Sequence, residues 1–99
     1  MARIELAPEV FDDFDRFLEY WEQFGVQDAS ERIGELMRAI EVLAENPLIG
    51  RSVRGGKREL VIGERSRGYI ALYRHLPTID TVFVLAVRSQ RERSFKRKG

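Results

Sequence analysis

Cysteine is absent from the sequence, and its absence excludes several kinds of chemistry. Disulfide bonds, a thiolate nucleophile and zinc–thiolate sites all require cysteine. A chain without cysteine suits a reducing compartment, and the first residues, Met1–Glu5, lack the apolar region of a signal peptide. We therefore expect a cytoplasmic protein.

Histidine occurs only once, at position 75. Histidine is the usual proton carrier near neutral pH, but no second histidine and no acidic pair at a useful spacing accompanies His75. Its neighbours Tyr73 and Leu76 favour an ordinary position in a strand. We therefore expect no metal, no cofactor and no catalytic residue.

Long apolar runs are also missing. The longest, Val82–Val87, is far shorter than the roughly 20 residues needed to cross a bilayer, so we expect no membrane association. The chain has 99 residues, of which 43% are hydrophobic and 33% charged, which is typical of a folded domain. This length leaves room for a single domain, residues 1–99, with one core.

The net charge of +1 conceals a strong asymmetry along the chain. Residues 1–47 carry twelve acids and four bases, a net of −8, whereas residues 48–99 carry thirteen bases and four acids, a net of +9. The C-terminal tail, residues 88–99, has a net charge of +5. Either the basic half has an electrostatic function, or the two halves neutralise each other in the fold.

Two amphipathic helices are predicted in the first half of the chain, after a short strand over residues 2–6. Apolar residues recur at helical spacing in both; they are Val10, Phe14, Phe17, Trp21 and Phe24, then Ala29, Ile33, Leu36, Ile40 and Leu43. The short link between the helices predicts an antiparallel hairpin. Gly25 should end the first helix and Asp28 should cap the second, with Glu31 reaching back to it. Three acids of the first helix, Asp12, Asp13 and Asp15, are expected to form a solvated face.

The apolar period changes from helical to alternating after residues 50–56, which we expect to be a mobile, glycine-rich connection. Segments around 59–62, 69–76 and 81–88 are rich in strand-forming residues and are separated by short turns. They predict a three-stranded antiparallel meander. The expected fold class is therefore α+β: an N-terminal strand, an antiparallel helical hairpin and the meander, in the order β-α-α-β-β-β.

Two stretches of the second half resemble the RelE/ParE toxin superfamily. One is Arg65-Ser66-Arg67-Gly68-Tyr69-Ile70-Ala71-Leu72-Tyr73-Arg74, and the other is the strand Val82–Val87 followed by Arg88-Ser89-Gln90-Arg91-Glu92. Asn46-Pro47-x-x-Gly50 and the predicted hairpin also fit, so the resemblance spans nearly the whole chain. It implies a RelE/ParE-like fold and a toxin of a type II toxin–antitoxin, plasmid-stabilisation-like system. It also implies a cognate antitoxin that binds the toxin in a hetero-oligomer.

The superfamily contains two activities. RelE-like members are ribosome-dependent mRNA endoribonucleases that use a cluster of basic residues and a C-terminal tyrosine. At the positions that look equivalent, this chain has Val61, Gly63, Ile70 and, in place of the tyrosine, Arg97. Only Arg65 and Arg91 fall where RelE-like basic residues lie. ParE-like members lack that cluster and inhibit DNA gyrase. The resemblance therefore favours a gyrase inhibitor that acts by binding, with the ribosome and mRNA as the alternative target.

Two groups of residues are candidates for binding. Residues expected to contact the target or nucleic acid are Arg65, Arg88, Arg91 and Arg93. Those expected to bind an acidic amphipathic segment of the antitoxin are Phe11, Leu18, Tyr20 and Arg74. Three other interpretations stay open at this point: a solvated tail without function, a plain nucleic-acid-binding module, and a toxin that has lost its activity.

Overall fold

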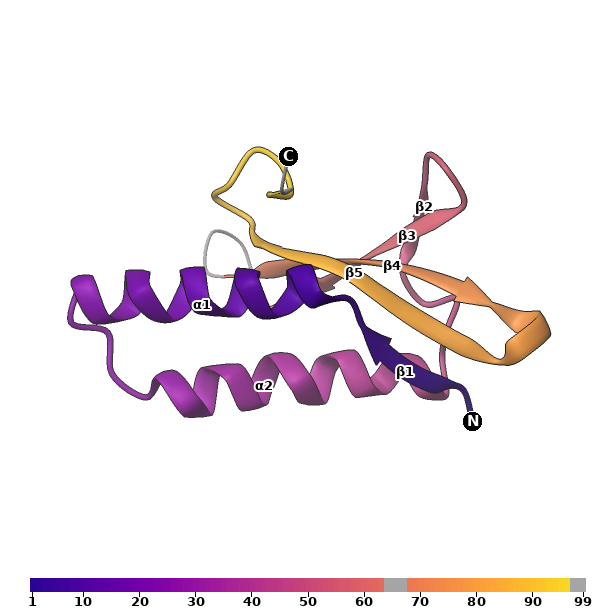
Figure 1. Cartoon of the computed structure of the whole chain (residues 1–99), viewed down its shortest axis with the longest axis horizontal. Coiled ribbons are helices and arrows are strands. Elements are labelled where there is room, and N and C mark those ends of the chain that lie inside the picture. Colours follow the sequence, from indigo (N-terminus) through magenta and orange to yellow (C-terminus); the bar gives the residue numbers. More distant parts are fainter. Residues whose placement is uncertain (64–67, 97–99) are drawn as a thin grey trace.

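The computed structural model describes residues 1–63 and 68–96 of the chain. In these residues the elements are β1 (Arg3–Leu6), α1 (Pro8–Gln23), α2 (Ala29–Glu41), the 3-10 helix η1 (Val42–Ala44), β2 (Arg51–Val53), β3 (Lys57–Ile62), β4 (Tyr69–Leu76), the 3-10 helix η3 (Pro77–Ile79) and β5 (Thr81–Ser89) (Figure 1). The α+β class and the predicted order of elements are confirmed. None of the helices in the described part is long and apolar enough to cross a membrane.

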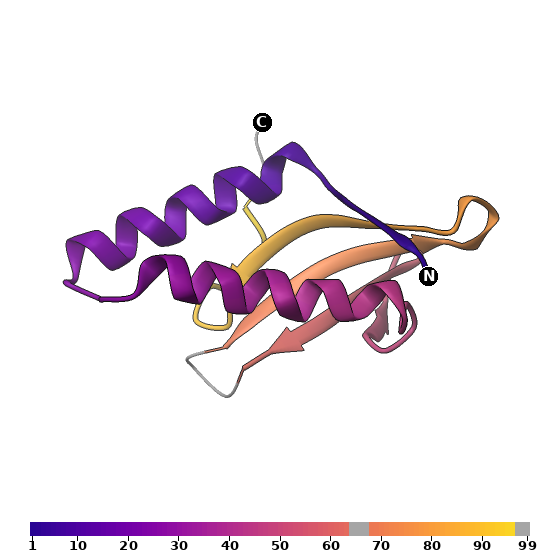
Figure 2. The ribbon, with the colours of Figure 1, turned by 90° about the horizontal axis from the view of Figure 1, so that it is seen from below.

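The strands in this part of the chain form one mixed sheet in the order β1-β5-β4-β3-β2. The predicted meander is present as β3, β4 and β5, each antiparallel to the next. β1 pairs in parallel with β5, from Arg3 opposite Thr81 to Leu6 opposite Val84. Both helices lie on one face of the sheet, as an antiparallel hairpin (Figure 2). The other face of the sheet is here called the outer face.

One prediction for the connection after the helices is wrong. Residues 50–56 were expected to be a mobile link, but Arg51–Val53 forms strand β2, which pairs with the start of β3. Gly55 and Gly56 have φ angles of +83° and +71° and make the tight turn between these two strands. A strand of three residues is too short to show an alternating pattern, so the glycines were the only visible signal.

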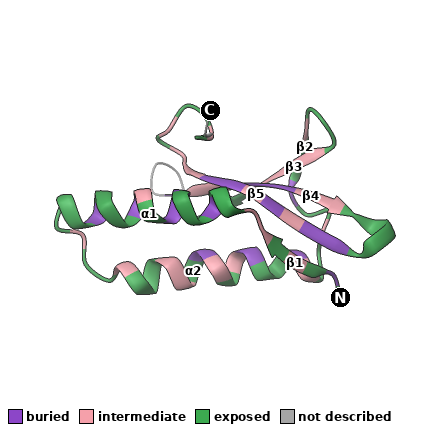
Figure 3. Ribbon diagram, in the orientation of Figure 1, coloured by how far each residue is buried: buried purple, intermediate pink, exposed green. Residues whose placement is uncertain are grey.

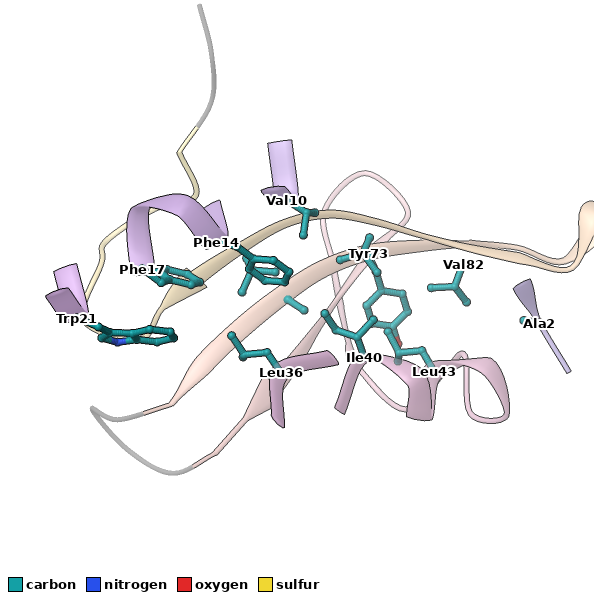
Figure 4. Close-up of a cluster of buried hydrophobic side chains, with 13 residues drawn as sticks. Ala2, Val10, Phe14, Phe17, Trp21, Leu36, Ile40, Leu43, Tyr73 and Val82 are labelled. Carbon is teal, nitrogen blue, oxygen red and sulfur yellow. The ribbon is translucent and has the colours of Figure 1, made fainter. Parts of the chain in front are cut away.

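The core lies between the helices and the sheet (Figure 3). Val10, Phe14, Phe17 and Trp21 of α1 face it from one side, and Leu36, Ile40 and Leu43 face it from the other (Figure 4). Phe24, which the pattern assigned to the same stripe, is 61% exposed, because α1 ends at Gln23 and the chain turns away. The rest of the predicted stripe is confirmed.

Tyr73 ties β4 to the loop that follows the helices. Its buried hydroxyl donates a hydrogen bond of 2.8 Å to the carbonyl of Pro47 and accepts one of 2.9 Å from the N–H of Gly50. A Cβ atom at Gly50 would lie only 2.7 Å from the Tyr73 ring. Close backbone approach to a buried ring therefore explains the glycine in the Asn46-Pro47-x-x-Gly50 segment.

The helix ends match the predictions in part. Gly25, with φ of +65°, follows the end of α1 in the left-handed conformation that glycine favours there. Asp28 precedes α2 as expected, but its own φ is +63° and, within the described residues, its side chain makes no capping hydrogen bond. The predicted capping box with Glu31 is therefore wrong, because the left-handed backbone of Asp28 differs from the extended one that a capping side chain requires.

Candidate functional site

The last strand loses its parallel neighbour before it ends. β1 stops at Leu6, and the N–H of Ala7 makes the final contact, 2.9 Å from the carbonyl of Val84. A bulge follows, because Tyr73 is opposite Val84 but Leu72 is opposite Ala86. The β1-side edge of β5 after this bulge is covered by polar side chains of α1.

Asp13 is the first of these side chains. Asp13 is only 1% exposed, and its carboxylate accepts a hydrogen bond of 2.8 Å from the main-chain N–H of Val87 and another of 2.7 Å from Nη1 of Arg16. The prediction that Asp13 belongs to a solvated face is therefore wrong, although its neighbours Asp12 and Asp15 are exposed. Burial is tolerated because both carboxylate oxygens are hydrogen-bonded.

Arg16 extends the contact to the tail. Its Nη2 donates a hydrogen bond of 3.1 Å to Oε1 of Glu92 and one of 3.4 Å to the carbonyl of Val87. Burial by itself lowers the pKa of Arg16, but the hydrogen bonds to Asp13 and Glu92 outweigh burial and raise the pKa above its usual value. Arg16 therefore stays positively charged between two carboxylates.

Glu92 closes a turn at the start of the tail. Its Oε1 also accepts a hydrogen bond of 2.9 Å from the N–H of Ser89. The main-chain N–H of Glu92 donates a hydrogen bond of 3.0 Å to the Ser89 carbonyl. Nη1 of Arg88 donates a hydrogen bond of 2.6 Å to the Glu92 carbonyl, while the Arg88 guanidinium lies 5.2 Å from the ring centre of Phe95. We call Asp13, Arg16, Ser89 and Glu92 the tail anchor, because together they fix this turn to α1.

The anchor places three of the predicted target-contact arginines near the end of β5. Arg88 is opposite Ile70 and alternates with the buried Val87, so it projects from the outer face of the sheet. Arg91 is exposed and lies toward α1, with Nη1 3.5 Å from the hydroxyl of Tyr20. Arg93 is exposed. Arg65 and Arg97, the other positions considered from the family resemblance, lie outside the described residues.

The predicted antitoxin-binding residues do not form one surface. Phe11 and Leu18 are exposed and share one side of α1, because they are two helical turns apart. Tyr20 follows Leu18 by two residues and faces a different side, where it stacks on Phe24 at 4.6 Å. Arg74 is on the outer face of the sheet, and its Nη2 donates a hydrogen bond of 2.8 Å to the carbonyl of Gly55.

A hollow of about 580 Å³ opens beside the tail anchor. We call it the aromatic hollow; its apolar lining is Phe17, Tyr20, Trp21, Phe24, Val26 and Tyr69, and its polar lining is Arg16, Arg32, Ser89, Arg91 and Glu92. The ring centres of Phe17 and Tyr69 are 5.0 Å apart, and the Trp21 ring stands perpendicular to that of Tyr69. The guanidinium of Arg32 lies 5.7 Å from the ring centre of Trp21.

Sequence reasoning named several residues of this hollow but not Arg16, Val26 or Arg32, and not the hollow itself. Phe17 and Trp21 were interpreted only as core residues, and they are buried, yet they also form walls of the hollow. Its residues come from α1, the link between the helices, the start of α2, the start of β4, the end of β5 and the tail. A pattern within one segment cannot show such a site, although the aromatic residues Tyr20 and Phe24, four positions apart, were a partial signal.

His75 is remote from both features. It alternates with the buried Tyr73 and Ala71 on the helix side of β4, whereas Arg88 projects from the outer face. His75 and Arg88 also lie at different ends of the β4–β5 pair. Arg88 is opposite Ile70, which is five residues, or about 17 Å, from His75 along β4. In the described residues, no group of His, Asp and Glu side chains could hold a metal ion.

One comparison with known proteins identifies a family. A family model described as the ParE toxin of the type II toxin–antitoxin system parDE matches residues 4–94. The comparison with curated proteins gave no match. The matched range begins in β1 and ends just after the tail anchor, so it includes every element of the sheet.

Proposed function

The chain belongs to the ParE toxin family of type II toxin–antitoxin systems, and we propose that it inhibits DNA gyrase by binding rather than by cutting RNA. Membership of this family implies a cognate antitoxin as a partner. The finer assignment depends on the chemistry that the described side chains offer at the end of β5.

The observation that carries the proposal is the cationic end of β5. Arg88, in β5, and Arg91 and Arg93, just after it, lie within a span of six residues, and the tail anchor holds the turn between them. Arginine binds carboxylates and phosphates through several fixed donors. A folded turn loses less conformational entropy on binding than a loose tail would, so these arginines suit recognition of a large anionic target.

RNA cleavage would need a group that can transfer a proton near these arginines. Arginine stays protonated and cannot act as a general base. His75 lies at the other end of the β4–β5 pair from Arg88. Burial raises the pKa of the Tyr69 hydroxyl, and that of Tyr73, above the ordinary value for tyrosine, so both keep their protons at neutral pH. The Tyr20 hydroxyl lies 3.5 Å from Nη1 of Arg91, and the Glu92 carboxylate is bound by Arg16 and by the Ser89 N–H. Binding is favoured over catalysis because Val61, Gly63 and Ile70 stand at positions where RelE-like members carry basic residues.

The test is inhibition of purified gyrase. We expect a stoichiometric amount of the toxin to block supercoiling and to increase the cleaved DNA complex. The Arg88→Ala variant should be about tenfold less potent, which corresponds to a loss of about 1.4 kcal/mol in binding free energy. A matched control is Arg54→Ala, which removes an exposed arginine from the β2–β3 turn, away from the tail (Figure 1).

Two results would contradict the proposal. Folded toxin that leaves gyrase unaffected would remove gyrase as the target. Breaks in mRNA during in vitro translation with added toxin would instead support the RelE-like alternative, in which the toxin acts on the ribosome.

A further inference from the structure

Two basic residues of β3 and β4 lie side by side on the outer face of the sheet. Arg58 is opposite Tyr73, so the preceding Lys57 and the following Arg74 adjoin each other across the two strands. Tyr73 is buried on the helix side, and its neighbours in the alternating pattern therefore project from the outer face. Like charges directly opposite each other destabilise a sheet. We call Lys57 and Arg74 the cation pair.

Both members of the cation pair lie beside the β2–β3 turn, which stands on the side of the sheet away from the helices (Figure 1). Nη2 of Arg74 donates its hydrogen bond of 2.8 Å to the carbonyl of Gly55 in this turn. Cε of Lys57 lies 3.9 Å from the position that a Cβ atom at Gly55 would take. Arg54, which is exposed in the same turn, adds a third positive charge. Cationic groups from two strands and a turn therefore gather at one place.

No carboxylate of the described residues forms an ion pair with the cation pair. The register places two acids near it on the outer face, Glu59 and Glu5. Glu59 is bound at 2.7 Å by Arg51, and Glu5 is paired with Arg3. Nε of Arg74 is buried and has no hydrogen-bond acceptor among the described residues. A buried donor without an acceptor is unfavourable, so this guanidinium is incompletely satisfied by the protein itself.

We propose that the cation pair binds a dianionic phosphate group, either free phosphate or the phosphate of a small monoester. Guanidinium and ammonium groups both donate to phosphate oxygens, and two positive charges match the two negative charges of such a group. A nucleic-acid backbone fits less well, because it carries one charge per phosphate and is followed by cations in a row. Along β3 the next outer-face residues are the acid Glu59 and the apolar Val61.

This site is separate from the cationic end of β5. Arg88 is opposite Ile70, which is four residues, or about 13 Å, from Arg74 along β4. Neither member of the cation pair lines the aromatic hollow. Phosphate binding by the pair therefore does not require that gyrase be the target, and it can be tested without gyrase.

The test is a titration of the isotopically labelled full chain with inorganic phosphate, followed by NMR at constant ionic strength and at about pH 8, where phosphate is mostly dianionic. The reporters are the Nε–H signal of Arg74 and the amide signals of Gly55 and Gly56. We expect them to shift and to saturate. Lys57→Gln should weaken binding about tenfold, because it removes one of the two charges and leaves the hydrogen bond from Arg74 to Gly55 in place.

The matched control is Arg38→Gln, which neutralises an exposed arginine of α2, on the other side of the sheet. Its affinity for phosphate should equal that of the unchanged chain. Equal weakening by Lys57→Gln and Arg38→Gln would overturn the proposal. It would also be overturned if acetate at the same ionic strength shifted the Arg74 signal as far as phosphate does, because the shift would then reflect any anion near a basic surface.

Two further probes separate the possible sources of the phosphate group. Adenosine 5′-monophosphate, a monoester, should bind at least as tightly as inorganic phosphate if the natural ligand is an ester, and weaker binding would assign the site to the free ion. Dimethyl phosphate, which carries one charge like a unit of a nucleic-acid backbone, should bind about tenfold more weakly than inorganic phosphate. Equal or tighter binding of dimethyl phosphate would refute a site for a dianion.

Discussion

The main-chain N–H of Val87 donates a hydrogen bond of 2.8 Å to the buried carboxylate of Asp13, which lies 74 residues earlier in the chain. This bond forms where β1 no longer pairs with β5, so a helix side chain satisfies a donor that a neighbouring strand would otherwise bind. Through Arg16, the same carboxylate is connected to Glu92 in the tail. The position of the basic tail thus depends on a polar contact made by α1.

Removal of the Asp13 carboxylate should destabilise the whole fold. In Asp13→Ala, the buried Val87 N–H loses its acceptor and Arg16 loses one of its two carboxylates, so we expect a loss of about 3 kcal/mol in the free energy of unfolding. Urea denaturation followed by Trp21 emission measures it. Asp15→Ala, an exposed acid of the same helix, should change stability by less than about 0.5 kcal/mol. Equal losses in the two variants would refute the role given to Asp13.

Removal of the Glu92 side chain should loosen the tail more than the core. In Glu92→Ala, Arg16 and the Ser89 N–H both lose their contact with Oε1, while Asp13 still binds Val87. We expect trypsin to cut after Arg91 and Arg93 several-fold faster, with a loss of only about 1 kcal/mol in global stability. The control is Glu45→Ala, an exposed acid after η1. Unchanged cleavage rates would show that the anchor does not hold the tail.

Two glycine-to-alanine variants should have opposite effects. A Cβ at Gly50 would lie 2.7 Å from the Tyr73 ring and 2.8 Å from the carbonyl of Glu59, so Gly50→Ala should cost about 1–3 kcal/mol. In α2, a Cβ at Gly34 would meet only the flexible end of Arg38, at 3.3 Å, and alanine favours a helix over glycine by about 1 kcal/mol. Gly34→Ala should therefore be neutral or stabilising. Thermal unfolding of both variants checks this, and a stable Gly50→Ala would contradict it.

Alkaline pH should destabilise the fold through its buried tyrosines. Burial raises the pKa values of Tyr69 and Tyr73 in the folded state above the ordinary value of 10.0. Above about pH 10 the tyrosine hydroxyls ionise more readily in the unfolded chain than in the folded protein. The contribution of the two neutral hydroxyls to the free energy of unfolding is therefore complete below that pH and falls as the pH rises further. Tyr73→Phe should flatten the loss when unfolding is measured from pH 9 to pH 11, after allowance for its lower stability at neutral pH. An unchanged slope in Tyr73→Phe would contradict the assignment to this residue.

Much of the fold could be predicted from local patterns. The apolar spacing that gave the helices reflects which residues must face a core, and it held for Val10, Phe14, Phe17 and Trp21. The same spacing failed for Asp13, because a carboxylate on the flank of a helix is usually solvated and only the neighbouring strand shows otherwise. The arginines of the candidate site could be named from the family resemblance, but their directions could not.

By itself, the sequence determined the α+β class and the order of the elements other than β2, because helical and alternating periods depend on residues close together in the chain. The family came from the resemblance of two stretches in the second half. Only the tertiary structure decided that β1 runs parallel to β5, that Val87 binds Asp13 and that Arg32 and Arg91 share one hollow. These relationships join residues about 60 to 80 positions apart. They follow from the packing of elements whose individual patterns do not specify which partner each of them meets.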